Sequence, residues 1–305
     1  MKIMSCILLL FAFSINLFSM ESVLIDFNNL NDTTIDFSEN AGIIYTDEEK
    51  EAMKINLSPK NWMATINSSS RTFEGLTKTY AVQVSQSGEY PGTNLLGIRV
   101  YFPERGANAY AEIRPPFDIP SYYDNKNNQN GKGEMFLNKG IIRNVGVLRK
   151  IHVRVLGNNY KYSLHLILKN RDNKVKYIFM GYLNFVGWQT LSWVNGSYEE
   201  ETYKRTIERF NKPYYPDEYP YIRLEGIMIQ RIDPNTTGNF VTMIKDIVVE
   251  YDPQFPDIGS ETIDKQESIF GIYENDLIDR AKAEMWRVNH RLFNQWLEKK
   301  KMNQD

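Results

Sequence analysis

Two stretches near the middle of the chain decide the fold: Ile151-His152-Val153-Arg154-Val155 and Tyr162-Ser163-Leu164-His165-Leu166. In both stretches apolar and polar side chains alternate, so that every second residue lies on the same side. A period of two is the pattern of a β-strand that buries one face and exposes the other. We therefore expect two strands whose aliphatic side chains are buried and whose histidines lie on the polar side.

The same alternation recurs from about residue 80 to residue 252. Further strands are expected at 96–102, 175–183, 188–193, 222–232 and 240–251. Short polar turns such as Asn170-Arg171-Asp172-Asn173 separate them, and no helical pattern is read between them. Many strands joined by short turns favour antiparallel pairing over a parallel α/β sheet. The predicted fold is mainly β: an antiparallel β-sandwich of jelly-roll type over residues 20–252, with a core that contains Ile151, Val153, Leu164, Leu166 and Val249.

The end of the chain has a different period. After Pro256, apolar residues recur at spacings of three and four and finish with Leu292 and Trp296. Residues 253–305 are therefore expected to form a linker and an amphipathic C-terminal helix over about 275–300. Two uses of its apolar stripe stay open, because the stripe can pack on the protein's own sandwich or dock onto a neighbouring subunit.

The beginning of the chain is typical of an exported protein. Lys2 precedes an apolar run over residues 7–17, and Ser19 stands just before the acidic Glu21. This order predicts a secretory signal peptide at residues 1–19, with a mature chain that starts at Met20 or Glu21. Cys6 would leave with the signal peptide, so the mature chain is expected to contain neither a disulfide nor a cysteine-based site. No later segment is apolar enough to predict insertion into a membrane.

Charge and motif content disfavour several functional classes. The formal net charge is −2, whereas a nucleic-acid-binding protein is expected to carry a basic face. We find neither a phosphate-binding glycine loop nor a serine nucleophile elbow, and His152, His165 and His290 lack the spacing of metal ligands. The triplet Glu199-Glu200-Glu201 is interpreted as a solvated turn. We expect no cofactor, no metal and no catalysis. Glycosidase chemistry stays open, because it needs only a pair of carboxylates across a cleft.

Aromatic residues make up 13% of the chain and suggest contact surfaces. They can pack in a core, form an interface with another protein, or offer a platform to a sugar. The residues considered for contacts are Trp188, Trp193, Tyr214, Tyr215, Leu292 and Trp296, with Tyr219 and Tyr221 added for the sugar platform.

Several motifs occur in an order that resembles a known family. These motifs are Gly187-Trp188-Gln189-Thr190-Leu191-Ser192-Trp193, Pro213-Tyr214-Tyr215-Pro216, residues 227–231, Gly238-Asn239-Phe240, residues 244–252, Arg114-Pro115-Pro116-Phe117-Asp118-Ile119-Pro120 and residues 140–146 with Arg143-Asn144-Val145-Gly146. In this order and spacing they resemble the FlaA family of spirochaete flagellar filament outer-layer (sheath) proteins. The resemblance covers about residues 75–252, and residues 244–247 also resemble the last strand of carbohydrate-binding jelly rolls.

The resemblance implies a structural protein of the periplasmic flagellum. Such a protein would coat the flagellin core filament, contact other sheath proteins and have no active site, and contacts between its own copies stay open. The residues considered for contacts would then meet the filament or a neighbouring subunit. The alternative is a secreted carbohydrate-binding module or adhesin with the same carbohydrate-binding-module-like fold.

Overall fold

Strands account for most of the chain that the structure describes. The computed structural model describes residues 19–30, 34–36, 46–52, 54–67, 76–102, 109–119, 136–211 and 220–254, together with residues 282, 283, 285–287, 290 and 294. The strands are β1 (Met20–Asp26), β2 (Ile35–Asp36), β3 (Lys54–Ile55), β4 (Met63–Ile66), β5 (Lys78–Gln83), β6 (Asn94–Phe102), β7 (Tyr110–Arg114), β8 (Ile141–Arg143), β9 (Val145–Asn158), β10 (Tyr162–Asn170), β11 (Val175–Tyr182), β12 (Val186–Val194), β13 (Tyr221–Arg231) and β14 (Gly238–Pro253). The helices are α1 (Asp47–Ala52) and α2 (Tyr198–Asn211), with short 3₁₀ turns η1 (Phe27–Asn29) and η2 (Pro59–Asn61).

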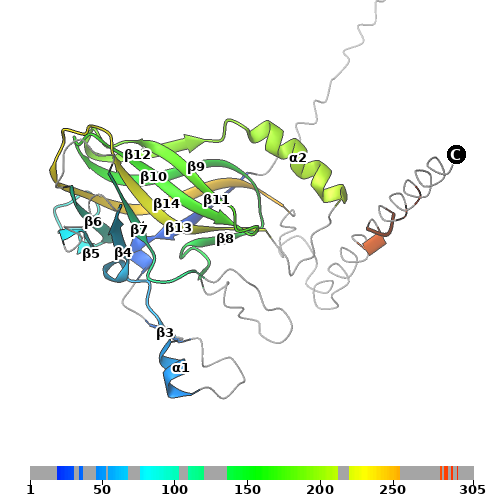
Figure 1. Cartoon of the computed structure of the whole chain (residues 1–305), viewed down its shortest axis with the longest axis horizontal. Helices are drawn as coiled ribbons and strands as arrows, with labels where there is room; N and C mark the ends of the chain where they lie inside the picture. Colours follow the sequence, from blue (N-terminus) through cyan, green and yellow to red (C-terminus); the bar gives the residue numbers. More distant parts are fainter. Residues whose placement is uncertain are drawn as a thin grey trace, which may run out of the picture.

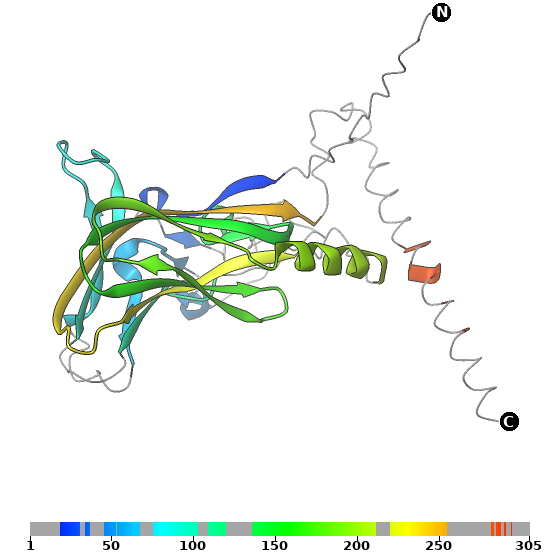
Figure 2. The same cartoon turned by 90° about the horizontal axis from the view of Figure 1, so that it is seen from above.

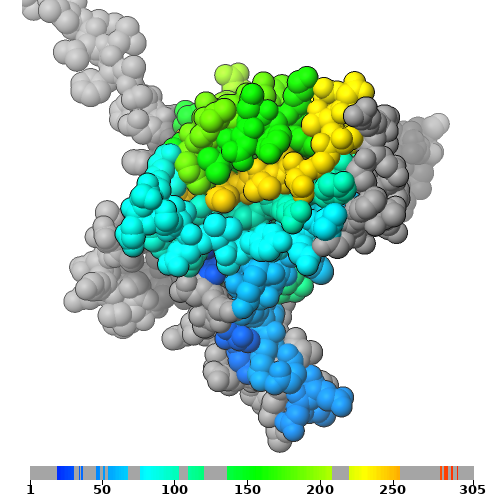
Figure 3. Space-filling view, turned by 90° about the vertical axis from the view of Figure 1, so that its left-hand side faces the viewer, coloured from blue at the N-terminus to red at the C-terminus, as the bar shows by residue number. Residues whose placement is uncertain are grey.

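The strands form two antiparallel sheets that face each other (Figure 1, Figure 2). Sheet 1 has the order β12-β9-β14-β6-β5, with β1 also paired to β14. Sheet 2 has the order β11-β10-β13-β7-β4, with β8 also paired to β13. A small pair, β2 with β3, stands apart with α1 below the sandwich (Figure 3). This architecture confirms the predicted antiparallel β-sandwich.

The inward faces of both sheets meet in one hydrophobic core. Ile151 and Val153 of β9 and Val249 of β14 lie on the inner face of sheet 1, and all three are fully buried. Leu164 and Leu166 of β10 are equally buried on the inner face of sheet 2. The alternation in the sequence therefore predicted the correct inward side of both strands, and burial of these side chains supplies much of the stability of the sandwich.

An aromatic cluster closes one part of this core. The ring of Tyr162 stacks on Phe102 at a centroid distance of 5.3 Å and lies 4.5 Å from the ring of Phe240. Tyr160 packs edge-on against Phe240 at 5.4 Å. Burial raises the pKa of Tyr162 to about 12, because the phenolate would lose its hydration. The cluster joins β6 of sheet 1 to β10 of sheet 2, so it holds the two sheets together.

Helix α2 was not predicted, and the interpretation of residues 199–201 as a solvated turn is wrong. These three glutamates form the first turn of α2, where the positive end of the helix dipole favours carboxylates. Ser197 followed three residues later by Glu200 is the sequence signature of a capping box, which marks the start of a helix. Asn195 anchors the start of the helix, because its Nδ2 donates to the carbonyl of Leu148 and to the Glu201 carboxylate, both at 2.8 Å.

Parts of the prediction fall outside the described residues. These parts are residues 1–18 of the expected signal peptide, Tyr214, Tyr215, Tyr219, Leu292 and Trp296. The described residues of the tail, from Lys282 to Asn294, are helical, and Trp286 is 68% exposed. The boundaries at residues 19 and 252 stay predictions. Among the described helices, none has the length and apolar character needed to span a membrane.

Candidate functional site

Trp188 and Trp193 lie on opposite faces of β12. They are five residues apart, and an odd separation along a strand reverses the side. Trp193 packs partly against the core between the sheets, and the ammonium group of Lys176 lies 5.2 Å from the centre of its ring. Trp188 lies on the other face, where Tyr90 packs edge-on against it at a centroid distance of 5.1 Å. The two tryptophans therefore do not share one platform.

Trp188 belongs to a polar and aromatic cluster on the outer face of sheet 1. The guanidinium group of Arg154 donates to the Tyr90 hydroxyl at 2.6 Å, to Glu89 at 2.6 Å and to Thr190 Oγ1 at 3.1 Å. The Lys245 ammonium lies 5.2 Å from the centre of the Tyr90 ring. Tyr90 comes from the loop between β5 and β6, so these contacts hold that loop against the sheet and leave Trp188 half-buried.

A serine, a histidine and a glutamate also meet on this outer face. His152 Nδ1 lies 2.7 Å from Ser192 Oγ, and His152 Nε2 lies 3.2 Å from Glu250 Oε1. Acyl transfer would further require oxyanion donors and a cleft that holds the substrate. The three residues come from the adjacent strands β12, β9 and β14, and Ser192 is exposed. We interpret them as a hydrogen-bonded row that joins three strands.

The most exposed aromatic side chains of the sandwich lie on β11, an edge strand of sheet 2. We call Tyr177, Phe179 and Tyr182 the aromatic row; they are 55%, 44% and 53% exposed. Phe179 and Tyr182 are three residues apart, yet their rings pack edge to face with a centroid distance of 5.1 Å. A register shift opposite Leu164 and His165 inserts one extra residue into β11 and brings both rings to the outer face.

Polar groups flank the aromatic row on the outer face of sheet 2. The imidazole of His165 lies 5.3 Å from the Phe179 ring and within 3.0 Å of Ser163 Oγ. Burial lowers the pKa of His165, because the charged ring would lose hydration. Further along the face, Arg114 pairs with Glu112 at 2.8 Å and with Glu225 at 3.5 Å. The resulting surface combines flat rings with hydrogen-bonding groups, as interfaces do.

The sequence contains a signal for the aromatic row. The span 175–183 was predicted as a strand, and Val175, Tyr177 and Phe179 share one phase of its alternation. Large apolar side chains in the phase opposite to the core-facing Ile178 indicate an exposed patch. The phase alone does not show whether another layer covers that face.

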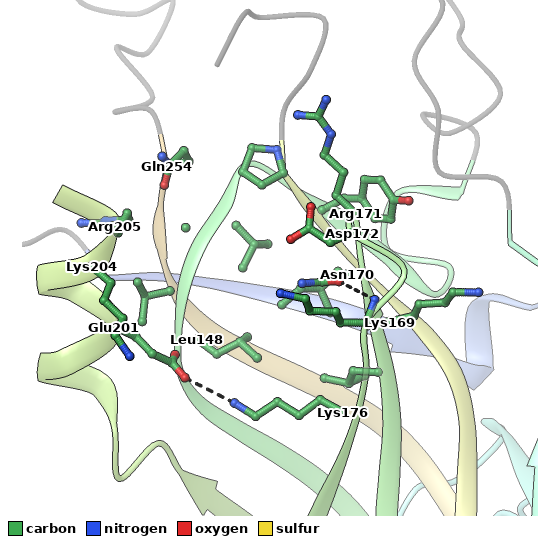
Figure 4. Close-up of a pocket in the computed structure, with 18 of the residues that line it drawn as sticks. Leu148, Lys169, Asn170, Arg171, Asp172, Lys176, Glu201, Lys204, Arg205 and Gln254 are labelled. Atoms are coloured by element: carbon green, nitrogen blue, oxygen red, sulfur yellow. Dashed lines mark hydrogen bonds and ion pairs between the residues drawn. The ribbon is translucent and has the colours of Figure 1, made fainter. Parts of the chain in front are cut away.

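A basic pocket of about 530 Å³ lies between α2 and the hairpin of β10 and β11 (Figure 4). The Lys176 side chain reaches across it to Glu201 of α2, with 3.6 Å between nitrogen and oxygen. The cationic residues of its lining are Lys169, Arg171, Lys174, Lys176, Lys204 and Arg205, and the acidic ones are Asp172 and Glu201. Within the described ranges, no group of three or more histidine, cysteine, aspartate or glutamate residues is arranged to hold a metal ion.

Solved structures with a related arrangement include a carbohydrate-binding module from the β-sandwich superfamily. It aligns with 62% of this chain and 56% of its own chain, at 11% sequence identity and a TM-score of 0.30. A similarity at this level carries no argument about a ligand.

Proteins found by sequence comparison share a higher identity with this chain. A flagellar filament outer layer protein of Spirochaeta aurantia is 37% identical over 300 residues, which cover 93% of this chain and 88% of the relative. The protein of the same description from Treponema pallidum (strain Nichols) is 31% identical over 314 residues, which cover 92% and 89%. The family model described as flagellar filament outer layer protein Flaa matches residues 26–258, from the end of β1 to just beyond β14. The chain therefore belongs to the FlaA family of flagellar filament outer layer proteins.

Proposed function

We propose that this protein is a subunit of the outer layer of a periplasmic flagellar filament. It coats a flagellin core together with other sheath proteins and tunes the shape and stiffness of the filament for motility. The observation that carries the proposal is the family match over residues 26–258, which includes both sheets of the sandwich. The relatives that support it are themselves described as flagellar filament outer layer proteins.

The exposed side chains of the sandwich suit lateral contact with a filament. Aromatic side chains bury a large area at a small entropic cost, so they are frequent at the centres of interfaces. We assign the filament contact to the aromatic row, Tyr177, Phe179 and Tyr182, which lies on an open face of an edge strand. A coat subunit binds many times along one filament, so each contact can be modest while repetition supplies avidity.

The predicted contact residues differ in how much surface they offer to a partner. Trp193 is partly buried against the core, so its proposed contact uses only its exposed edge. Trp188 is half-buried on the outer face of sheet 1 and can take part in a second contact. Tyr214, Tyr215, Leu292 and Trp296 stay proposed contacts with the filament or with a neighbouring subunit.

The proposed location is the periplasm. A signal peptide at residues 1–19 would export the chain, and a mature chain without cysteine needs no disulfide to fold there. We propose no cofactor and no catalysis, because the assigned role consists of binding alone. N-terminal sequencing of the native protein would test the export, since recovery of Met1 would contradict it.

A gene deletion tests the outer-layer assignment. Core filaments should still assemble in the deletion strain, but electron microscopy should show them thinner or differently coiled, and swimming should be impaired. Purified filaments of the parent strain should contain the protein. If they lack it and the deletion leaves filament geometry unchanged, the assignment is wrong.

A pair of variants tests the aromatic row itself. Tyr177→Ser combined with Phe179→Ser should reduce the amount of protein on purified filaments while its periplasmic level is maintained. Tyr203→Ser on α2 is the matched control, because Tyr203 is 68% exposed and lies outside the row. Equal filament occupancy of both variants would contradict the assigned contact.

A carbohydrate-binding module or adhesin is the second candidate function. The observation in its favour is the aromatic row itself, since its exposed rings can stack on a sugar and its tyrosine hydroxyls can form hydrogen bonds with it, next to His165. Saturable binding of a defined polysaccharide, lost in the Tyr177→Ser and Phe179→Ser variant, together with absence from filaments, would place this function first.

A further inference from the structure

The basic pocket concentrates positive charge on a protein whose net charge is −2. Six cationic and two acidic side chains line it. Lys176 pairs with Glu201 at 3.6 Å, and Lys204 pairs with Glu200 at 2.6 Å. The ammonium groups of Lys169 and Lys174 have no carboxylate partner in the part of the chain that the structure describes. The pocket therefore has positive charge available for an acidic ligand.

The floor of the basic pocket is apolar. Its lining includes Val147 and Leu148 of β9, Leu168 of β10 and Ile222 of β13. Figure 4 shows Leu148 between α2 and the hairpin of β10 and β11, beside the ion pair of Glu201 and Lys176. An apolar floor with a cationic rim fits a ligand that presents hydrophobic side chains flanked by carboxylates.

The wall that α2 provides is held firmly in place. The hydroxyl of Tyr198 donates to the Asp252 carboxylate at 2.6 Å, and Arg205 Nη1 donates to the carbonyl of Pro253 at 3.2 Å. Arg205 packs directly over Gly146, where a Cβ atom would come within 2.7 Å of Nη1. The same Cβ atom would lie 2.9 Å from the backbone carbonyl oxygen of Asp252, which cannot move aside as a flexible side chain can, so the close packing at this position favours glycine. The Nε of Arg205 is buried and has no hydrogen-bond partner among the described residues.

One segment of this chain has the matching chemistry. Residues 257–264 read Asp257-Ile258-Gly259-Ser260-Glu261-Thr262-Ile263-Asp264, which sets two isoleucines among three carboxylates. This acidic segment lies outside the described residues and begins three positions after Gln254, which lines the basic pocket. Its carboxylates complement the lysines of the rim, and its isoleucines fit the apolar floor.

We propose that the basic pocket of one subunit receives the acidic segment, residues 257–264, of a neighbouring copy. The backbone N–H of Gln254 still donates to the carbonyl of Asn144 at 2.9 Å, so the chain is held in the sheet up to that point. Pro256 has a fixed φ and disfavours the helical conformation at Phe255. These restrictions disfavour a tight reversal directly after Gln254, so we assign the segment to the pocket of a neighbouring copy.

Such a contact joins subunits head to tail. Each contact joins the acidic segment of one subunit to the basic pocket of the next. Because these are two different surfaces, the contact is heterologous. Heterologous contacts that do not close into a ring produce open linear arrays. This mode of self-association uses a surface separate from the aromatic row, and it is independent of the outer-layer assignment.

Zero-length carbodiimide cross-linking of the full mature chain tests the proposal. Equal amounts of ¹⁴N- and ¹⁵N-labelled protein are mixed, coupled, digested and analysed by mass spectrometry. We expect Lys169 or Lys174 to be joined to Asp257, Glu261 or Asp264, with some cross-linked pairs carrying one peptide of each isotope. Pairs that carry only one isotope would place the segment in its own pocket, and absence of these pairs would leave the pocket without this ligand. Either result overturns the proposal.

Charge-reversal variants provide a second test by analytical ultracentrifugation. Lys169→Glu combined with Lys174→Glu should weaken self-association roughly tenfold, because two attractive contacts become repulsive. Lys78→Glu on β5 is the control and should leave it unchanged, since Lys78 does not line the pocket. Circular dichroism verifies that each variant is folded.

A complementary variant makes the test specific. Asp257→Lys, Glu261→Lys and Asp264→Lys together should also weaken self-association, but mixing this protein with the Lys169→Glu and Lys174→Glu variant should restore it. Added salt should weaken the association of the parent protein, because partly exposed charge pairs are screened. Self-association that persists in the Lys169→Glu and Lys174→Glu variant would overturn the proposal.

Discussion

Replacement of Leu166 by alanine should destabilise the sandwich strongly. Leu166 is 0% exposed on β10, where its neighbours across the ladders are Ile178 of β11 and Ile227 of β13. The substitution removes three carbon atoms, which corresponds to about 2.4 kcal/mol at roughly 0.8 kcal/mol for each buried methylene. Because hydrogen-bonded strands on both sides limit collapse into the cavity, we expect a total loss of about 3–4 kcal/mol in the free energy of unfolding.

Urea unfolding followed by tryptophan fluorescence measures this loss. Leu76→Ala is the matched control, because Leu76 is 40% exposed and lies outside the strands. The control should lower the free energy of unfolding by less than about 1 kcal/mol. A loss below about 0.5 kcal/mol for Leu166→Ala, with an unchanged denaturant slope, would show that the inward side of β10 is assigned incorrectly.

Three further perturbations follow from the structure. Gly146→Ala should lower the free energy of unfolding by roughly 1–3 kcal/mol in a urea titration, because the new Cβ would lie 2.9 Å from the backbone carbonyl oxygen of Asp252 as well as 2.7 Å from Arg205 Nη1; an unchanged midpoint would contradict this close approach. Tyr177→Ser with Phe179→Ser should change the unfolding midpoint little, since both rings are exposed, while filament occupancy falls. Stability should decrease as the pH drops below about 6.5, because burial holds the pKa of His165 below its unfolded value and the unfolded chain binds the proton more readily. His165→Gln should reduce the dependence of the free energy of unfolding on pH. If that dependence is unchanged in the variant, groups other than His165 cause it.

Much of the candidate site could be derived from local patterns. The parity of Trp188 and Trp193 already places them on opposite faces of one strand, so a shared platform could have been rejected from the sequence. The capping-box pattern of Ser197 and Glu200 likewise predicts the start of α2. The strand patterns on either side of it do not extend into this segment. The sequence predicts only part of the aromatic row. The alternation places Tyr177 and Phe179 on one face, but the bulge that turns Tyr182 towards Phe179 depends on the pairing with β10.

The sequence by itself determined that residues such as Ile151, Val153 and Leu166 form strands with one buried side, since alternation is a property of neighbouring residues and strand geometry has a period of two. Only the tertiary structure decided which outer faces stay open and which charges meet. Lys169 of β10, Arg205 of α2 and Gly146 of β9 gather around one pocket because sheet pairing and helix docking bring distant segments together. No local pattern encodes that proximity, as it arises from the packing of the whole chain around one core.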